Sequence, residues 1–242
     1  MMPSKLLKIT LSEADKVEIL RRTSLFAGLT DEELCHLAQL AHTVRLGRHE
    51  HLFLRGDAGN KLYIVIHGVI RIGSIAPDGR EVTLNLIKEG QVFGEIAALD
   101  GSARTADATA VDEAHLLAVN RTHLLGFLTT NPEACLRMMA ALCDRLRWIS
   151  GLLDDANFLD LRSRLGKRLL VLGQLFGTPR ADGSIRISLI LSQQDLASHI
   201  GATRESVNKL IKQWEAEGLI AYDGRRLVIK NPQQLDQLIE RQ

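Results

Sequence analysis

The sequence has little that would suit a secreted or membrane-spanning protein. Only three of its 242 residues are cysteines, and Cys35, Cys135 and Cys143 are too scattered to suggest a disulfide framework. No uncharged apolar run approaches the roughly 18 residues that a membrane-spanning helix needs. The N-terminus has no apolar core followed by a small-residue cleavage site, so no secretion signal is expected. These absences predict a cytoplasmic protein that works away from the membrane.

A strong net charge is also lacking. The chain carries 30 Lys and Arg against 29 Asp and Glu, a formal net charge of +1 with neutral histidines. The balance differs along the chain, because residues 158–242 carry 13 basic against 9 acidic side chains and the remainder carries 17 against 20. A basic C-terminal third is the direction expected of a domain that faces phosphate groups.

The region from Val44 to Val119 has the pattern of a β-domain. Short apolar or alternating runs recur there, separated by glycines and by the turn Pro77-Asp78-Gly79. Strands at such intervals predict an all-β barrel or sandwich. Residues 12–42, which precede it, are predicted to be helical, with a capping box at Thr30 and Glu33. The expected strands are His51–Leu54, Leu62–Ile66, Val69–Ile72, Val82–Ile87 and His115–Val119.

A long helix is predicted from Asn131-Pro132 to about Asn157. Its side chains form a seam with spacings of three and four over about three heptads, the pattern by which two helices pack along each other. A second apolar stripe, which includes Met138 and Leu152, lies beside the first. One stripe would cover the β-domain and the other would meet a second subunit; burial in a single large domain is the alternative. The expected dimer-interface residues are Leu136, Met139, Cys143, Leu146, Ser150 and Leu153.

The last third of the chain has the pattern of a winged helix-turn-helix. Asp160, Ser192 and Thr203 are each predicted to cap a helix, over 161–176, 193–200 and about 204–217. Gly201 supplies the tight turn between the second and third of these helices. Asp223-Gly224 predicts a closing hairpin, because Asp-Gly is a strong signal for a two-residue turn.

Recognition helices meet base edges with their N-terminal residues. Arg204 can bind the O6/N7 edge of a guanine with both arms, and Glu205 can accept from a cytosine amino group. The alternative is a solvated helix face, which the following hairpin makes the weaker interpretation. The expected DNA-binding residues are Gln193, Thr203, Arg204, Glu205, Asn208 and Lys209.

A second constellation lies in the β-region, where Gly94-Glu95-Ile96 is followed by Arg104-Thr105. A glycine lets the backbone approach a ligand, and the start of a helix directs free N–H groups toward it. A nearby carboxylate can accept from sugar hydroxyls, and an arginine beside a hydroxyl can neutralise a phosphate.

In combination and in order, these motifs resemble the cyclic-AMP receptor protein/FNR (CRP/FNR) superfamily of bacterial regulators, from about Leu25 to Ile229. The resemblance implies an α+β chain: a cyclic-nucleotide-binding β-roll in residues 1–134, a dimerisation helix in 135–157 and a winged helix-turn-helix in 158–242. It implies a homodimeric transcription regulator rather than an enzyme. Such a protein answers cyclic AMP or cyclic GMP, binds double-stranded DNA at a palindromic TGTGA-like operator and acts with RNA polymerase.

The same resemblance implies roles for individual residues. Glu95 would hold the ribose hydroxyl, and Arg104 would hold the cyclic phosphate with Thr105. Arg145 would support the ligand side of the interface, and Ser150 would read the purine across the dimer seam. The implied nucleotide-binding residues are Gly94, Glu95, Ile96, Arg104, Thr105, Arg145, Ile149 and Ser150.

Two positions depart from the pattern of this family. Ile149 stands where the cyclic-AMP receptors often have threonine, which removes one polar contact to the base and leaves the choice between cyclic AMP and cyclic GMP open. Lys209 stands where the relatives commonly have arginine, so the contact there is expected to shift toward that of a point charge.

Other sensors occur in the same superfamily. An iron–sulfur cluster needs four thiolates, more than the three cysteines here can supply. A haem or metal role for His42, His49, His51 and His67 is an alternative to ordinary surface histidines, although no metal is expected. No nucleophile–base pair accompanies Glu95, so no catalytic site is predicted. A ligand-independent or redox-responsive regulator remains an alternative function.

Overall fold

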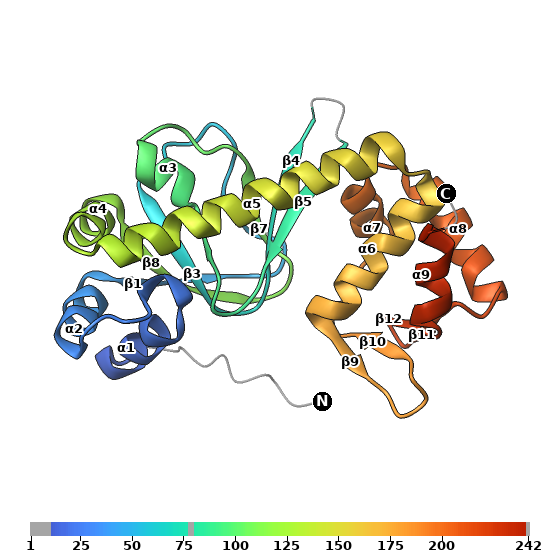
Figure 1. Ribbon diagram of the computed structural model, residues 1–242, viewed down its shortest axis with the longest axis horizontal. Helices are drawn as coiled ribbons and strands as arrows, with labels where there is room; N and C mark the ends of the chain where they lie inside the picture. The colour runs from blue at the N-terminus through green and yellow to red at the C-terminus, as the bar shows by residue number, and fades with distance from the viewer. Residues whose placement is uncertain (1–10, 77–79, 241–242) are drawn as a thin grey trace. The chain divides into compact units, whose positions relative to one another are not determined.

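The computed structural model describes residues 11–76 and 80–240, so the turn expected at Pro77-Asp78-Gly79 lies outside the described residues. By their contacts these residues form two units (Figure 1). The first unit comprises the described parts of Met1–Ser74 and Asn85–Arg145, and the second those of Ile75–Leu84 and Leu146–Gln242.

The first unit is built on two four-stranded sheets, with the orders β1-β8-β3-β6 and β2-β7-β4-β5. Both sheets contribute to one buried cluster, with Val65 and Leu116 from the first sheet and Ile70 and Ala108 from the second. The expected β-roll is confirmed. The strands are β1 (His42–Leu46), β2 (His51–Phe53), β3 (Lys61–His67), β4 (Ile70–Ile75), β5 (Glu81–Ile87), β6 (Val92–Phe93), β7 (Asp107–Ala110) and β8 (Ala114–Asn120).

Helices pack on the other side of β3 and β8, where they form a second buried cluster. The helical region predicted over 12–42 is two helices, because the chain turns between them and buries Leu25 and Phe26. The predicted capping box is confirmed, since the Thr30 hydroxyl accepts from the Glu33 N–H and the Glu33 carboxylate accepts from the Thr30 N–H. The elements are α1 (Glu13–Arg22), η1 (Ser24–Phe26), α2 (Asp31–Leu40), α3 (Glu95–Asp100) and α4 (Arg121–Thr130).

The predicted long helix is α5 (Pro132–Phe158), which belongs to the first unit up to Arg145 and to the second from Leu146 onward. Met138 from its second stripe is buried in the core of the first unit. The seam side chains are exposed instead: Leu136 is 62% and Leu146 is 69% accessible. A row of exposed apolar side chains on a regular helix is typical of an interaction surface.

The second unit combines helices with a small sheet of order β11-β12-β10-β9. The three predicted caps are confirmed: the side chains of Asp160, Ser192 and Thr203 each accept from the backbone N–H three residues later. Trp214 is fully buried in its core. The elements are α6 (Leu161–Phe176), β9 (Gly177–Pro179), β10 (Ile185–Ile187), α7 (Gln193–Ile200), α8 (Arg204–Ala216), β11 (Ile220–Asp223), β12 (Arg226–Ile229) and α9 (Pro232–Glu240).

Candidate nucleotide pocket and DNA-binding surface

Gly94 closes β6 and caps the short helix α3 with a left-handed backbone, φ 76°. A Cβ at this position would lie 2.8 Å from the Arg104 guanidinium and 3.2 Å from the Lys61 carbonyl oxygen. Neither the dihedral angle nor the space suits any residue but glycine. The backbone here is therefore in close contact with the arginine that the sequence indicates as the phosphate ligand.

Arg104 is 5% exposed and held in place from several sides. Its two terminal nitrogens donate to the carbonyl oxygens of Gly94 (2.8 Å) and Lys61 (2.9 Å). The guanidinium lies over the Phe53 ring, 4.2 Å from its centroid, and 5.6 Å from that of Tyr63. Such contacts fix the orientation of the cation without neutralising it.

Glu95 is 3% exposed and forms an ion pair with Arg145 of α5 through Oε1. Its other oxygen, Oε2, and the Nε of Arg104 are buried with no hydrogen-bond partner among the described residues. Buried polar atoms without partners are costly, and a ligand is one way to satisfy them. An acceptor beside a cation fits a molecule that carries both a hydroxyl and an anionic group.

The surroundings shift two pKa values at this site. Burial lowers the pKa of Arg104 below its usual value, and the neighbouring Tyr63, Glu95 and Asp57 oppose that shift. An arginine nevertheless keeps its charge at neutral pH. Burial also raises the pKa of the Tyr63 hydroxyl, so this ring stays neutral.

The other implied nucleotide ligands lie as follows. Thr105 is exposed directly after Arg104, and Ile96 is half-buried in the first turn of α3. Ile149 and Ser150 are exposed on the part of α5 that belongs to the second unit. Within the first unit, the structure therefore brings Gly94, Glu95, Arg104 and Arg145 together.

The helix-turn-helix is formed by α7 and α8, with Gly201 in the left-handed conformation between them. Its predicted wedge includes Leu196, Val207 and Ile211, which are all buried. This packing leaves one face of α8 in solvent, where three of the predicted contacts are exposed. These three are Arg204, Glu205 and Lys209.

The remaining predicted DNA contacts support this face. Thr203 caps α8. Gln193, the first residue of α7, donates from Nε2 to Oδ1 of Asn208 at 2.9 Å. This bond links the first residue of α7 to the second turn of α8.

Sequence reasoning missed residues at both sites. Phe53 and Tyr63 hold Arg104, yet their positions on β2 and β3 give no local signal of that contact. Arg225 is exposed in the turn of the β11–β12 wing, and the Arg-Arg pair directly after Asp223-Gly224 was the signal that could have found it. The nearby carboxylate of Asp223 forms ion pairs with Arg180 and Arg186, so it does little to neutralise the charge of Arg225.

The four histidines of the haem alternative are spread over β1, β2, the turn between them and the end of β3. His51 hydrogen-bonds the Thr109 hydroxyl at 2.9 Å. Across residues 11–76 and 80–240, no three His, Cys, Asp or Glu side chains form a group that could hold a metal ion. No helix of this described part is long and apolar enough to cross a membrane.

The fold and the two sites define a class of protein, a ligand-binding β-roll followed by a winged helix-turn-helix, and comparisons with known proteins agree. Residues 43–131 match the family model of the cyclic nucleotide-binding domain. Residues 163–238 match that of the Crp-like helix-turn-helix domain. The chain belongs to the CRP/FNR superfamily of transcription regulators.

Curated relatives and solved structures are consistent with this membership. The chain is 34% identical to the CRP-like cAMP-activated global transcriptional regulator of Mycobacterium tuberculosis, over 90% of this chain and 97% of the relative. It is 32% identical to the global nitrogen regulator of Synechococcus elongatus, over 77% and 84%. A CRP-family transcriptional regulator from Thermus thermophilus superposes with a TM-score of 0.70 at 28% identity, over 81% of this chain and 96% of that one.

Proposed function

We propose that this chain is a homodimeric transcription regulator whose DNA binding responds to a cyclic nucleotide. The observation that carries the proposal is the cradle around Gly94. There the buried Glu95 and Arg104 each keep one polar atom without a partner, and a Cβ has no room. These features fit a ribose 3′,5′-cyclic phosphate, because the group combines a hydroxyl with a single negative charge.

In this proposal Glu95 accepts a hydrogen bond from the ribose hydroxyl through Oε2, while its ion pair with Arg145 holds the carboxylate in place. Arg104 faces the cyclic phosphate with its free Nε–H and its charge, assisted by the hydroxyl and N–H of Thr105. The N–H groups at the start of α3 add partial positive charge on the same side. The ligand itself supplies no chemistry; it is bound and released.

Dimerisation and DNA binding follow from the other two surfaces. The exposed apolar seam of α5 is the surface on which a second copy would pack, with Leu136 and Leu153 at its two ends and Leu146 between them. Two copies related by a two-fold axis would present two α8 helices to a palindromic operator. Arg204 and Glu205 would read bases, and Arg225 of the wing would contact a phosphate. RNA polymerase is the proposed protein partner.

Calorimetry on ligand-stripped protein tests the effector. Cyclic AMP and cyclic GMP are titrated separately, and 5′-AMP, which lacks the cyclic ester, serves as the control. At least one cyclic nucleotide should bind with one site per chain, and 5′-AMP should bind more weakly. The absence of heat with both, together with a haem band in the absorbance spectrum, would replace this proposal with the haem alternative.

A further inference from the structure

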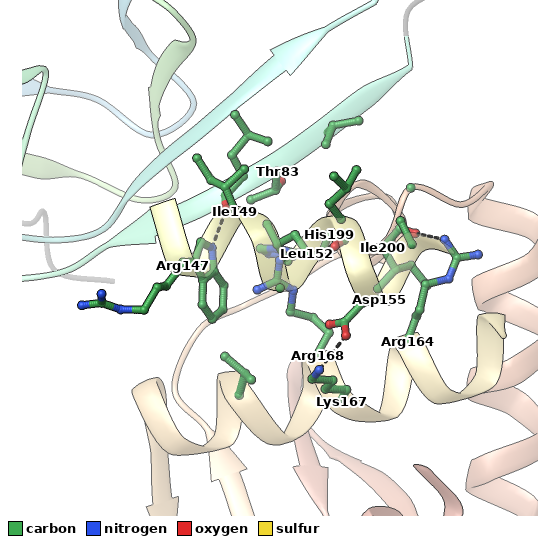
Figure 2. A pocket seen from close by; sticks show the side chains of 18 residues that line it. Thr83, Arg147, Ile149, Leu152, Asp155, Arg164, Lys167, Arg168, His199 and Ile200 are labelled. Carbon is green, nitrogen blue, oxygen red and sulfur yellow. Dashed lines mark hydrogen bonds and ion pairs between the residues drawn. The ribbon is translucent and has the colours of Figure 1, made fainter. Parts of the chain in front are cut away.

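A cavity that shares no residue with the cradle at Gly94 lies within the second unit (Figure 2). Its volume is about 570 Å³, which falls in the range of small-molecule sites, roughly 300–1,000 Å³. It is lined by the start of β5, the second half of α5, α6 and the end of α7. Most of its wall is aliphatic, with Leu84, Leu152, Val171 and Ile200 among the lining residues.

One wall of this cavity carries a buried cation, Arg168 of α6, which is 7% exposed. Its guanidinium donates to the His199 carbonyl oxygen across 3.4 Å, a weak hydrogen bond, and lies over the Trp148 ring at 5.2 Å. Among residues 11–76 and 80–240, no carboxylate is within ion-pair distance of it. The nearest acidic group that influences it, Asp155, is bound by Lys167 at 2.5 Å.

A buried charge without a counter-charge is costly to a protein. Burial lowers the pKa of Arg168 to about 10, and the nearby Asp155 only partly opposes this shift. The neighbouring Arg164 adds a second positive charge to the wall, and it donates to the Ile200 carbonyl oxygen at 3.0 Å. The cavity therefore combines an apolar interior with an excess of positive charge.

The position of Arg168 is fixed by its neighbours. The Trp148 indole N–H donates to the Leu84 carbonyl oxygen at 2.7 Å, which anchors the ring on which the guanidinium lies. The Thr83 and Ser198 hydroxyls bond each other at 2.8 Å and join β5 to α7. An anchored guanidinium fork is preorganised for the two oxygens of a carboxylate.

We propose that this cavity binds a small aliphatic carboxylate, with its two oxygens at Arg168 and its hydrocarbon tail against the aliphatic wall. A monoanion is favoured over a phosphate dianion, because a second negative charge would be costly to bury against the aliphatic wall. The site shares no residue with the cradle at Gly94, so the proposal does not depend on nucleotide binding. It also touches α7, the helix that precedes the recognition helix.

Calorimetry with octanoate as the probe tests this assignment. The control ligand is 1-octanol, which has the same tail without the charge. Octanoate should bind with one site per chain, and octanol should bind at least about tenfold more weakly, since a charge-assisted hydrogen bond would be lost. Equal affinity for the two probes, or no binding of octanoate, would overturn the proposal.

Two variants locate the binding. Arg168→Met keeps a long side chain of good helix propensity and removes the buried charge. Gly151→Leu fills the cavity from α5, where an added Cβ would meet no atom within 4 Å. Both should weaken octanoate binding about tenfold or more, with thermal melting to verify the fold. Octanoate affinity that is unchanged in both variants would rule out this cavity.

A matched control is Arg162→Met on the same helix. Arg162 also lies over a tryptophan, Trp214, but it pairs with Glu217 outside the cavity. Octanoate affinity should be the same as in the native protein; an equal loss in this variant would mean that net charge, rather than Arg168, attracts the probe. Competition between octanoate and cyclic nucleotide would likewise refute a separate site, whereas failure of nucleotide binding alone would leave this result intact.

Discussion

Arg104 is almost fully buried, and its contacts are carbonyl oxygens and ring faces rather than carboxylates. Its charge is thus oriented but not cancelled. This makes it the residue on which nucleotide affinity should depend most.

We expect Arg104→Ala to weaken cyclic-nucleotide binding by about 2–5 kcal/mol, because the phosphate would be left without its counter-charge. Arg104→Lys should have a nucleotide affinity between those of the native protein and the alanine variant. Lysine keeps the charge but lacks the guanidinium that donates to the carbonyl oxygens of Gly94 and Lys61. Calorimetry measures both. Affinity equal to that of the native protein in the alanine variant would mean that the pocket lies elsewhere.

At the DNA face, Arg204 is exposed at the first turn of α8 and Thr203 fixes where that helix begins. Arg204→Ala should cost about 1–3 kcal/mol per half-site and relax the preference at one base pair. Lys212→Ala, farther along the same helix, is the matched control and should leave base preference intact. Binding assays on single-base operator variants distinguish the two, and an unaltered base preference in the Arg204 variant contradicts the assignment.

Among the elements, α5 exposes a row of apolar side chains that another surface would be expected to cover. Its seam residues are exposed along the helix, with Leu153 64% accessible, although Met138 in the neighbouring stripe is buried. We expect Leu146→Asp to give a folded monomer, because a charge in the seam could neither pair nor reach water cheaply. Ala141 is exposed and lies five residues from both Leu136 and Leu146, so it points away from the seam, and Ala141→Asp should remain dimeric. Sedimentation of both variants decides the matter; a dimer of native strength for Leu146→Asp would exclude this seam.

Elements with local signals could be predicted from the sequence. The caps at Thr30, Asp160 and Ser192 depend on residues three positions apart, and the Asp223-Gly224 turn depends on two neighbours. Likewise, the spacing of three and four along α5 is a property of that segment alone. Such signals depend only on residues that are close together in the sequence, so they can be recognised without the folded structure.

Elements that depend on distant partners were missed. All four residues of β7 are buried, although Asp107 and Thr109 are polar, and the segment has no large apolar side chain that would mark a buried strand in the sequence. Helix α9 has its Leu235 against α6, where a Cβ at Gly166 would come within 3.5 Å. The contacts of Arg104 with Phe53 and Tyr63 join residues about 40–50 positions apart. The sequence could name Arg104 as a ligand, but it could not show how the side chain is held.

For the whole molecule, two-fold symmetry would set the form of the operator. Two α8 helices related by a dyad should occupy successive major grooves, so the site should be an inverted repeat with half-site centres about 34–36 Å apart. Footprinting measures that spacing, and raising the salt concentration should weaken binding equally for all sequences that keep the phosphate contacts. Protection of a single asymmetric half-site would contradict a symmetric dimer.

The coupling between ligand and DNA should pass through α5, which contributes residues to both units. Arg145 joins it to Glu95 at the nucleotide cradle, and the helix ends at Phe158, two residues before the Asp160 cap of α6. Ser150 lies between these two points, in the seam. A ligand held at Arg104 and Ser150 can shift the arrangement of the recognition helices only by its differential affinity for the two arrangements.

A gain in DNA affinity of about tenfold to thousandfold requires about 1.4–4 kcal/mol of coupling, and the same factor must tighten nucleotide binding when operator is present. We expect Ser150→Ala to reduce this factor more than it reduces DNA binding without ligand, because it removes a contact that depends on the seam. Nucleotide is titrated into native and variant protein, each with and without operator. Four equal affinities would mean that the nucleotide site does not control DNA binding, and the regulator would then be constitutive or respond to another signal.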